Sequence, residues 1–437
     1  MRRFLIGITL LSLLVIVSTL AWRTFARPVL CDACSVVVIS LDAVNATSFE
    51  EDMPLLAERA RASGVVFERA YASTKWGLPG TAALLTGEYP WDLGIWNDRR
   101  GLPKDTDTIA TVFSAYGYTT AAFAQGPFID RAWGMDRGFH VWEAAAGQTK
   151  TYETDVIPSA RAWITQTPEP YFAFIQPYSL YELFDAENQG LAFSDLQQAY
   201  AGDEAAANRL KDGYARRLGE IDQELNAFLD TALAGERAKK TVVVITASYG
   251  QDFIDTPTKG VGGVTLPTHH VLNVPLVFFI PDQKPKRVTP SVESRHMAAT
   301  IFDIVGADHS PLTGESLLPY MRGGETEQQT VRAASSWDPA DTLIEPPAEF
   351  YASLERRRRI VLIPETTQAA PYVDNAAYAT IRGTWQHLET TSGDTYLFNT
   401  QRDPQGLENL YGRLNTLPPR ERLDALLFTS FIENLQR

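Results

Sequence analysis

Five short apolar runs alternate with helical segments over the larger, N-terminal part of the chain. They are continuously apolar, and they are Ser35–Leu41, Tyr118–Ala124, Tyr171–Gln176, Thr241–Thr246 and Val274–Ile280. Such runs are typical of strands in a parallel sheet, because helices cover both of its faces. Between them, the segment from Tyr214 to Leu233 gathers apolar side chains on one helical face. The pattern predicts an α/β domain over residues 35–324, with a mostly parallel sheet flanked by helices.

The pattern changes after Gly324, where a polar stretch from Glu325 to Thr330 follows. Beyond it the strand-like runs are shorter, and a helical pattern begins at about Pro418. These runs are Arg359–Ile363, Tyr378–Arg382 and Gln386–Glu389. We therefore predict a smaller α+β domain over residues 325–437.

Residues 1–22 have the composition of a membrane-spanning helix. No charged residue occurs from Phe4 to Trp22, a length close to the roughly 20 apolar residues that cross a bilayer. Arg2 and Arg3 precede this run, so the positive-inside rule keeps the N-terminus in the cytoplasm. We predict a signal anchor over 1–22, a juxtamembrane linker over 23–34 and a main domain outside the cytoplasm. The alternative is a secretory signal that is cleaved after Ala21 or Ala26, which would release the protein.

The chain contains two cysteines, Cys31 and Cys34, which lie in the linker. A CxxC pair can be redox-active, can be half of a metal site or can form a local disulfide. No second CxxC motif occurs, and the predicted compartment is oxidising, so we predict a local disulfide.

The overall composition limits the classes of partner. Hydrophobic residues make up 45% of the chain, which is typical of a globular protein, and the formal net charge is −14. Because nucleic-acid phosphates require clustered Lys and Arg, this charge argues against nucleic acid as a partner.

Polar residues follow two of the predicted strands at one edge of the sheet. The first strand ends before Asp42, and the strand at Thr241–Thr246 is followed by Ala247–Gly250. A helix predicted to start near Pro79 and to end at Gly87 should direct its N-terminus toward the same edge. Sites in open α/β sheets form beyond the carboxyl ends of the strands, and helix N-termini attract anions. A candidate site is therefore expected here.

Several segments in this order resemble the sulfatase family of the alkaline phosphatase superfamily. Val36–Asp42 resembles its metal-binding first strand, and Phe67–Ser73, Leu78–Pro79 and Leu84–Pro90 resemble its nucleophile loop and helix. The matching segments of the middle and end of the family are Gly117–Phe123, Arg137–Phe139, Val271–Val277, Gly314–Pro319, Arg322–Gly323, Leu397–Phe398, Asp403–Pro404 and Glu408–Leu410. The resemblance covers nearly all of the chain from Ser35 onward. It implies the alkaline phosphatase type of α/β fold and a divalent cation in a hydrolase site.

The catalytic positions that the resemblance implies have lost their usual residues. The family nucleophile, a formylglycine, Ser or Thr, lies two residues before the proline, where this chain has Gly77. The Ser and the Arg or His that follow it in the family correspond to Gly80 and Thr81. The family's substrate-side histidines would fall in Gln176–Tyr181, which contains no histidine.

The metal positions are also changed. The family's Thr-Ser-Asp-His-Gly motif is Thr-Ala-Ser-Tyr-Gly here, so that Ser248 and Tyr249 replace two ligands. Ala43 stands where the family has Asp or Thr, and Asp42 alone retains a ligand type. One carboxylate cannot hold Ca²⁺ or Mg²⁺ tightly, because these ions need six or more oxygens. Asp42 is either a residual metal ligand or a capping or salt-bridged carboxylate.

The remaining candidates have both a functional and a structural interpretation. Ser73 and Thr74 are candidate nucleophiles or ordinary turn hydroxyls, and His269 and His270 are candidate ligands or structural residues. The run Arg356–Arg359 is an anion site or a solvated, ion-paired face. Asp252 and Asp255 are candidate replacement ligands for a metal ion. Three tryptophans form either a sugar-stacking platform or part of the core, and they are Trp76, Trp91 and Trp96.

These observations predict a membrane-anchored, extracytoplasmic and catalytically inactive sulfatase-like protein with no cofactor. It would bind a protein partner or an anionic envelope component, or serve as a structural subunit of a membrane assembly. The alternative is an active sulfuric or phosphoric ester hydrolase in which Asp42 binds Ca²⁺, Mg²⁺ or Mn²⁺, helped by Asp252, Asp255 or His269.

Overall fold

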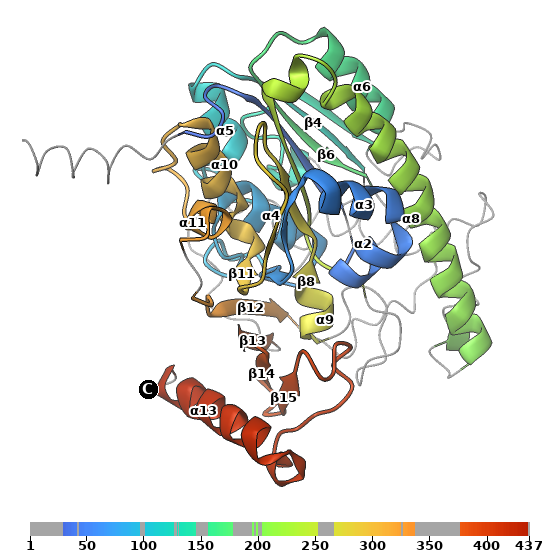
Figure 1. Cartoon of the computed structure of the whole chain (residues 1–437), viewed down its shortest axis with the longest axis vertical. Coiled ribbons are helices and arrows are strands. Elements are labelled where there is room, and N and C mark those ends of the chain that lie inside the picture. Colours follow the sequence, from blue (N-terminus) through green and yellow to red (C-terminus); the bar gives the residue numbers. More distant parts are fainter. Residues whose placement is uncertain are drawn as a thin grey trace, which may run out of the picture.

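The structure is a computed structural model. It describes residues 29–41, 43–96, 101–125, 129, 131–145, 156–177, 195, 198–199, 203–251, 266–324, 327–336 and 376–435. Figure 1 shows a large sheet between two layers of helices, with a small sheet and the C-terminal helix α13 (Pro419–Leu435) below them.

The large sheet has eight strands in the order β10-β2-β9-β7-β1-β6-β4-β5. Every neighbouring pair is parallel except the two pairs that involve β9, which are antiparallel. The strands are β1 (Ser35–Leu41), β2 (Val65–Phe67), β4 (Thr119–Gln125), β5 (Val141–Ala145), β6 (Tyr171–Gln176), β7 (Thr241–Ala247), β9 (Leu276–Phe279) and β10 (Lys286–Val288). The predicted α/β sheet is therefore confirmed, as a mixed sheet.

The run Val274–Ile280 departs from the prediction of one continuous parallel strand. Asn273–Val274 forms β8 in a separate three-stranded sheet with β3 (Ala70–Tyr71) and β11 (Val292–Glu293). Pro275 lies between β8 and β9, and its missing N–H interrupts the ladder at that point. The segment thus passes from one sheet to the other, and β9 runs against its neighbours.

Helices cover both faces of the large sheet, which explains the continuously apolar strands. Val36 and Val38 of β1 pack in one core with residues of α4 (Gly77–Thr86), α5 (Ile109–Ala115) and α10 (Met297–Val305). Val37 and Ile39 pack in the other core with residues of α3 (Pro54–Ser63), α6 (Val156–Gln166) and α8 (Glu204–Ala232). Figure 1 shows these two groups of helices on opposite sides of the sheet.

The long helix α8 begins at Glu204, ten residues before the predicted start at Tyr214. Its first turn is capped by Asp203, whose carboxylate accepts hydrogen bonds from the backbone N–H groups of Ala205 and Ala206. The shorter helices of the main domain are α2 (Ala46–Asp52), α9 (His269–Leu272) and α11 (Leu318–Arg322), with the 3₁₀ turns η1 (Arg131–Trp133), η3 (Arg237–Lys239) and η5 (Ser294–His296).

The C-terminal part forms a four-stranded antiparallel sheet in the order β12-β13-β14-β15. The elements are β12 (Val331–Ser336), β13 (Ala376–Arg382), β14 (Trp385–Thr390), β15 (Thr395–Asn399), η6 (Leu414–Thr416) and α13 (Pro419–Leu435). Two predicted strands and the predicted helix are confirmed, whereas β12 and β15 were not predicted. The predicted strand Arg359–Ile363 lies outside the described residues.

The start of the described chain is tied to the main domain. Cys31 and Cys34 form a disulfide, as predicted, and the backbone N–H groups of Leu30 and Cys31 donate to the carbonyl of Ile304 in α10. Over the described residues no helix is long and apolar enough to cross a membrane. The predicted anchor at 1–22 lies outside those residues and stays a prediction.

Candidate functional site

The carboxyl ends of β1 and β7 lie side by side at the predicted site. Leu41 pairs with Ala247, and the loop after β7 turns back so that the carbonyl of Tyr249 accepts a hydrogen bond from the N–H of Val44 at 3.1 Å. Ala43 is buried, and its backbone has a positive φ of 58°. Its carbonyl accepts a hydrogen bond from the Tyr214 hydroxyl at 2.5 Å. Asp42 itself lies outside the described residues.

Helix α4 directs its N-terminus at this edge, as predicted. It spans Gly77–Thr86, all ten of its residues are buried, and Gly87 ends it in the left-handed conformation at a φ of 75°. Gly77 occupies the first helical position, so the family's nucleophile position lies at the helix N-terminus without a side chain.

Gly80 is in direct contact with the loop after β7. A Cβ atom at position 80 would lie 2.2 Å from the carbonyl oxygen of Ser248, a distance that no side chain tolerates. The family's serine at this position would therefore not fit. The first turn of α4 packs on the Ser248 backbone in the region that the resemblance assigns to nucleophile and metal.

The side chains brought together here are poor ligands for a divalent cation. Thr81 donates to the Gln176 amide oxygen at 3.3 Å, and Ser248 and Tyr249 are buried with 1% and 4% of their surface exposed. Within the described ranges no cluster of three or more His, Cys, Asp or Glu residues could hold a metal ion. Hydroxyls and one amide do not match the oxygen-rich, anionic sets that Ca²⁺ and Mg²⁺ require. The described residues therefore do not fit the family's cation.

The candidate replacement ligands do not converge on this point. The His269 ring is occupied in the C-terminal part of the chain, since Nδ1 lies 3.1 Å from the Gln386 amide oxygen and Nε2 lies 2.7 Å from the carbonyl of Asp403. Burial lowers the pKa of His269, and the hydrogen bonds to Gln386 and Asp403 oppose this shift. Asp252 and Asp255 lie outside the described residues.

His270, in contrast, lies beside the candidate site. Its Nε2 is 3.2 Å from the side-chain nitrogen of Asn45, which also donates to the carbonyl of Gln251 at 2.9 Å. Because that nitrogen is a donor, Nε2 of His270 is the acceptor in this contact. Asn45 was not predicted as a site residue. Its position as a polar residue just after the end of a strand could have indicated it.

The hydroxyls of the nucleophile loop hold structure together. Thr74 Oγ1 and Ser335 Oγ lie 2.8 Å apart, and Ser335 Oγ accepts from the N–H of Lys75 at 3.0 Å. The indole N–H of Trp76 donates to the carbonyl of Ser336 at 3.2 Å, and the Ala334 N–H donates to the carbonyl of Ser73. This segment is thus bound to β12, which favours the structural interpretation of Ser73 and Thr74.

Two of the candidate tryptophans pack against neighbouring rings. Trp91 stacks on Tyr89 with ring centroids 4.4 Å apart, and Trp96 meets Tyr378 edge to face at 6.1 Å. The run Arg356–Arg359 lies outside the described residues.

Lys75 was missed because lysine is rarely buried. It is 1% exposed, with its ammonium 5.4 Å from the centre of the Trp76 ring.

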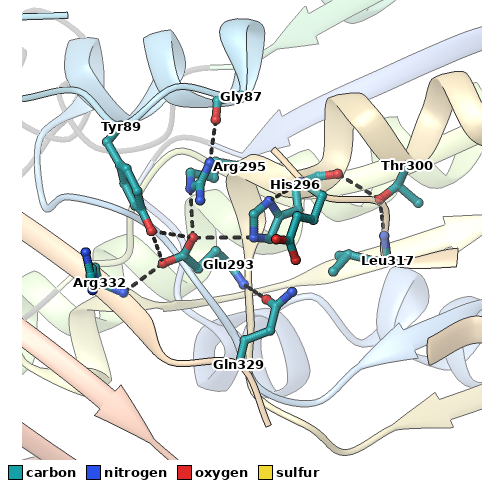
Figure 2. A network of polar contacts seen from close by, with 10 residues as sticks. Gly87, Tyr89, Glu293, Arg295, His296, Thr300, Leu317, Gln329 and Arg332 are labelled. Carbon is teal, nitrogen blue, oxygen red and sulfur yellow. Dashed lines mark hydrogen bonds and ion pairs between the residues drawn. The ribbon is translucent and has the colours of Figure 1, made fainter. Parts of the chain in front are cut away.

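A buried carboxylate, Glu293, anchors the C-terminal end of α4 (Figure 2). Its oxygens accept from the Tyr89 hydroxyl at 2.9 and 3.0 Å, from Arg295 Nε at 2.7 Å and from the Arg332 N–H at 2.7 Å. Arg295 also donates to the carbonyl of Gly87 at 2.7 Å. Burial raises the pKa of the Glu293 carboxyl, and Arg295 opposes this shift. The network joins α4, η5 and β12.

His296 extends this network as a neutral ring. Its Nδ1 accepts from the N–H of Glu315 at 2.9 Å, so the proton is on Nε2, which lies 3.4 Å from a Glu293 oxygen. Burial, and then the nearby charge of Arg295, lower the pKa of His296 to about 3.

We expect stability to fall with acid because of this histidine. An unfolded histidine binds a proton below about pH 6.5, whereas the folded ring does not until about pH 3. The neutral His296 ring therefore contributes fully to the free energy of unfolding above about pH 6.5, and this contribution is lost as the pH falls toward 3. At about pH 5 the loss is about 2 kcal/mol. His296→Asn keeps an acceptor near Nδ1 and does not titrate, so urea unfolding should depend less on pH in this variant. Equal pH dependence in both proteins would contradict the assignment.

Comparison with known proteins agrees with the fold. The sulfatase family model matches residues 35–307. No curated protein matches the chain in sequence. The phosphonate monoester hydrolase of Agrobacterium radiobacter is 16% identical, with a TM-score of 0.67 over 92% of this chain and 95% of that one.

Two further solved structures have the same architecture. The phosphonate monoester hydrolase from Silicibacter pomeroyi is 17% identical, with a TM-score of 0.65 over 92% of this chain and 95% of that one. A 2-O GAG sulfatase is 15% identical, with a TM-score of 0.67 over 92% of each chain. These similarities show a shared fold. Because the family model covers more than half of the residues, this protein belongs to the sulfatase family.

Proposed function

We propose that this protein is a catalytically inactive member of the sulfatase family that acts by binding. The observation that carries the proposal is the contact between Gly80 and the Ser248 carbonyl, where a Cβ would lie at 2.2 Å. Helix α4 is packed against the loop that would hold the cation, and Gly77 has no side chain to attack a substrate.

Two independent losses support inactivity. The described residues at the site supply hydroxyls and an amide, whereas a divalent cation needs anionic oxygens. Without the cation, ester hydrolysis loses several kcal/mol of charge stabilisation in the transition state. The absence of a nucleophilic side chain at Gly77 removes the covalent route. A single substitute residue does not restore both functions.

The proposal includes the cellular location. The uncharged run from Phe4 to Trp22 after Arg2 and Arg3 supports an anchored protein with its main domain outside the cytoplasm. The Cys31–Cys34 disulfide supports an oxidising compartment. There the protein would bind a protein partner or an anionic envelope component.

The test is a search for turnover by the full-length protein in detergent. We expect no hydrolysis of para-nitrophenyl esters of sulfate, phosphate and a phosphonate above the level of Asp42→Ala, with Ca²⁺, Mg²⁺ or Mn²⁺ added. Circular dichroism of both proteins controls for folding. Turnover that the parent has and Asp42→Ala lacks would refute inactivity and would establish the alternative, a metal-dependent ester hydrolase built around Asp42.

A further inference from the structure

A polar cleft lies at the seam between the main domain and the C-terminal sheet. Its volume is about 490 Å³, within the range of small-molecule sites. Six of the side chains that line it are Arg69, His270, Asn273, Gln328, Thr384 and Thr400. None of the positions Ala43, Gly77, Thr81, Ser248 and Tyr249 lines it, so the cleft adjoins the candidate site through His270 but does not include those positions.

The cleft lies beyond the carboxyl edge of the large sheet. Strand β2 is antiparallel to β9, which is antiparallel to β7, so β2 points the same way as β7 and β1. Arg69 follows the end of β2 and precedes β3, and Asn273 begins β8. Ligands of open α/β sheets bind at this kind of edge.

Two backbone carbonyls hold the Arg69 side chain in the cleft by hydrogen bonds. Its Nε donates to Thr289 at 2.7 Å and its Nη1 donates to Gly383 at 3.3 Å. These bonds come from the main domain and from the turn between β13 and β14, so both parts of the chain fix the side chain. A guanidinium has five N–H donors, and these bonds leave Nη2 available.

The charge of Arg69 has no carboxylate partner in the part of the chain that the structure describes. The neighbouring Glu68, which also lines the cleft, pairs with Arg287 at 2.5 Å. Burial raises the pKa of Tyr71, another lining residue, to about 12, so its hydroxyl stays neutral. The cleft thus holds a fixed positive charge in a chain whose net charge is −14.

An unpaired hydrogen-bond acceptor also lines the cleft. The side-chain oxygen of Asn273 is shielded from solvent and has no hydrogen-bond partner within the described residues. A shielded acceptor of this kind is costly unless a ligand or water donates to it. Together, Arg69 and Asn273 suit a ligand that carries both an anionic group and hydroxyl or amine donors.

We propose that this cleft binds the oxyanion group, a sulfate, phosphate or carboxylate, of a polar ligand through the Arg69 guanidinium. Hydroxyls such as those of Thr384 and Thr400 complete the site, and Asn273 accepts a hydrogen bond from the rest of the ligand. The assignment deepens the proposed binding function and rests on it, because it identifies where an anionic component would be held.

The experiment measures anion binding by the full-length protein in detergent. Inorganic sulfate, inorganic phosphate and acetate are titrated at constant ionic strength against chloride, by calorimetry and by thermal melting. We expect one of the three to bind and to raise the melting temperature, and Arg69→Gln to weaken its binding at least tenfold. The identity of the anion that binds distinguishes a tetrahedral group from a carboxylate.

Two variants keep the outcome clear. Asn273→Asp leaves the contacts of Arg69 intact and adds a carboxylate to the cleft, so it should also weaken binding tenfold or more. Arg61→Gln, on the exposed surface of α3 and paired with Glu50, should bind as the parent does. If no anion binds, or if binding survives in Arg69→Gln and is lost in Asp42→Ala, the cleft is not the site. Ester hydrolysis, in contrast, would refute inactivity and leave Arg69-dependent binding untouched.

Discussion

Replacing Gly80 by serine, the residue type of the family at this position, is expected to destabilise the protein by about 3 kcal/mol. The added Cβ would lie 2.2 Å from the Ser248 carbonyl oxygen and 2.9 Å from its carbon. Both are backbone atoms at the end of β7, so the helix or the strand end must move, and overpacking of a core costs in this range. Urea unfolding of the parent and Gly80→Ser measures the loss.

The matched control for this change is Gly219→Ser in α8. Nothing lies within 4 Å of a Cβ built at Gly219, and glycine is unfavourable inside a helix. This variant should be as stable as the parent or slightly more stable. If Gly80→Ser is equally harmless, α4 does not pack on the loop after β7 as described, and the main support for an inactive site is lost.

Replacing Glu293 by glutamine is expected to cost about 3–5 kcal/mol, the range for breaking a buried ion pair. Glutamine has nearly the same shape, but it leaves the Arg295 guanidinium, whose side chain is 11% exposed, without a counter-charge. The NH₂ group of the glutamine would also face the Tyr89 hydroxyl, Arg295 Nε and the Arg332 N–H, which are themselves donors to the carboxylate. The midpoint of thermal or urea unfolding measures the effect.

The control for Glu293→Gln is Glu236→Gln. Glu236 pairs with Lys239 on the surface, where the two side chains are 83% and 67% exposed, and such pairs contribute little. Little measurable change is expected. A Glu293→Gln protein as stable as Glu236→Gln would mean that the network in Figure 2 does not hold the C-terminal end of α4.

The sequence predicted the elements whose two faces are both buried. The runs at Ser35–Leu41 and Tyr171–Gln176 coincide with β1 and β6, because every residue in them is buried against helices. The direction of β9 was not predictable, since an apolar run has no information about strand orientation. The strand β12 was missed because it mixes alanine with serine, and its burial depends on contacts with the segment around Thr74.

The sequence predicted that the helix beginning near Pro79 and the loop after the strand Thr241–Thr246 meet at one edge of the sheet, whereas the roles assigned to the residues there stay predictions. The resemblance located Gly77, Gly80, Ser248 and Tyr249, and the structure places α4 against the loop after β7. The close approach at Gly80 was not predictable, since a glycine in a sequence does not reveal what lies next to it. Arg69 was not singled out, because a single arginine after a short strand is typical of a solvated surface.

The hydrogen bonds between β12 and the segment from Ser73 to Trp76 have a consequence for folding. The chain that leads into α4 is completed by a strand from beyond residue 330, and Glu293 also needs the Arg332 N–H. The main domain therefore cannot reach its final arrangement until this late part of the chain has docked. The two parts should unfold in one cooperative transition, and the segment from Ser73 to Trp76 completes its native contacts only after β12 has been synthesised.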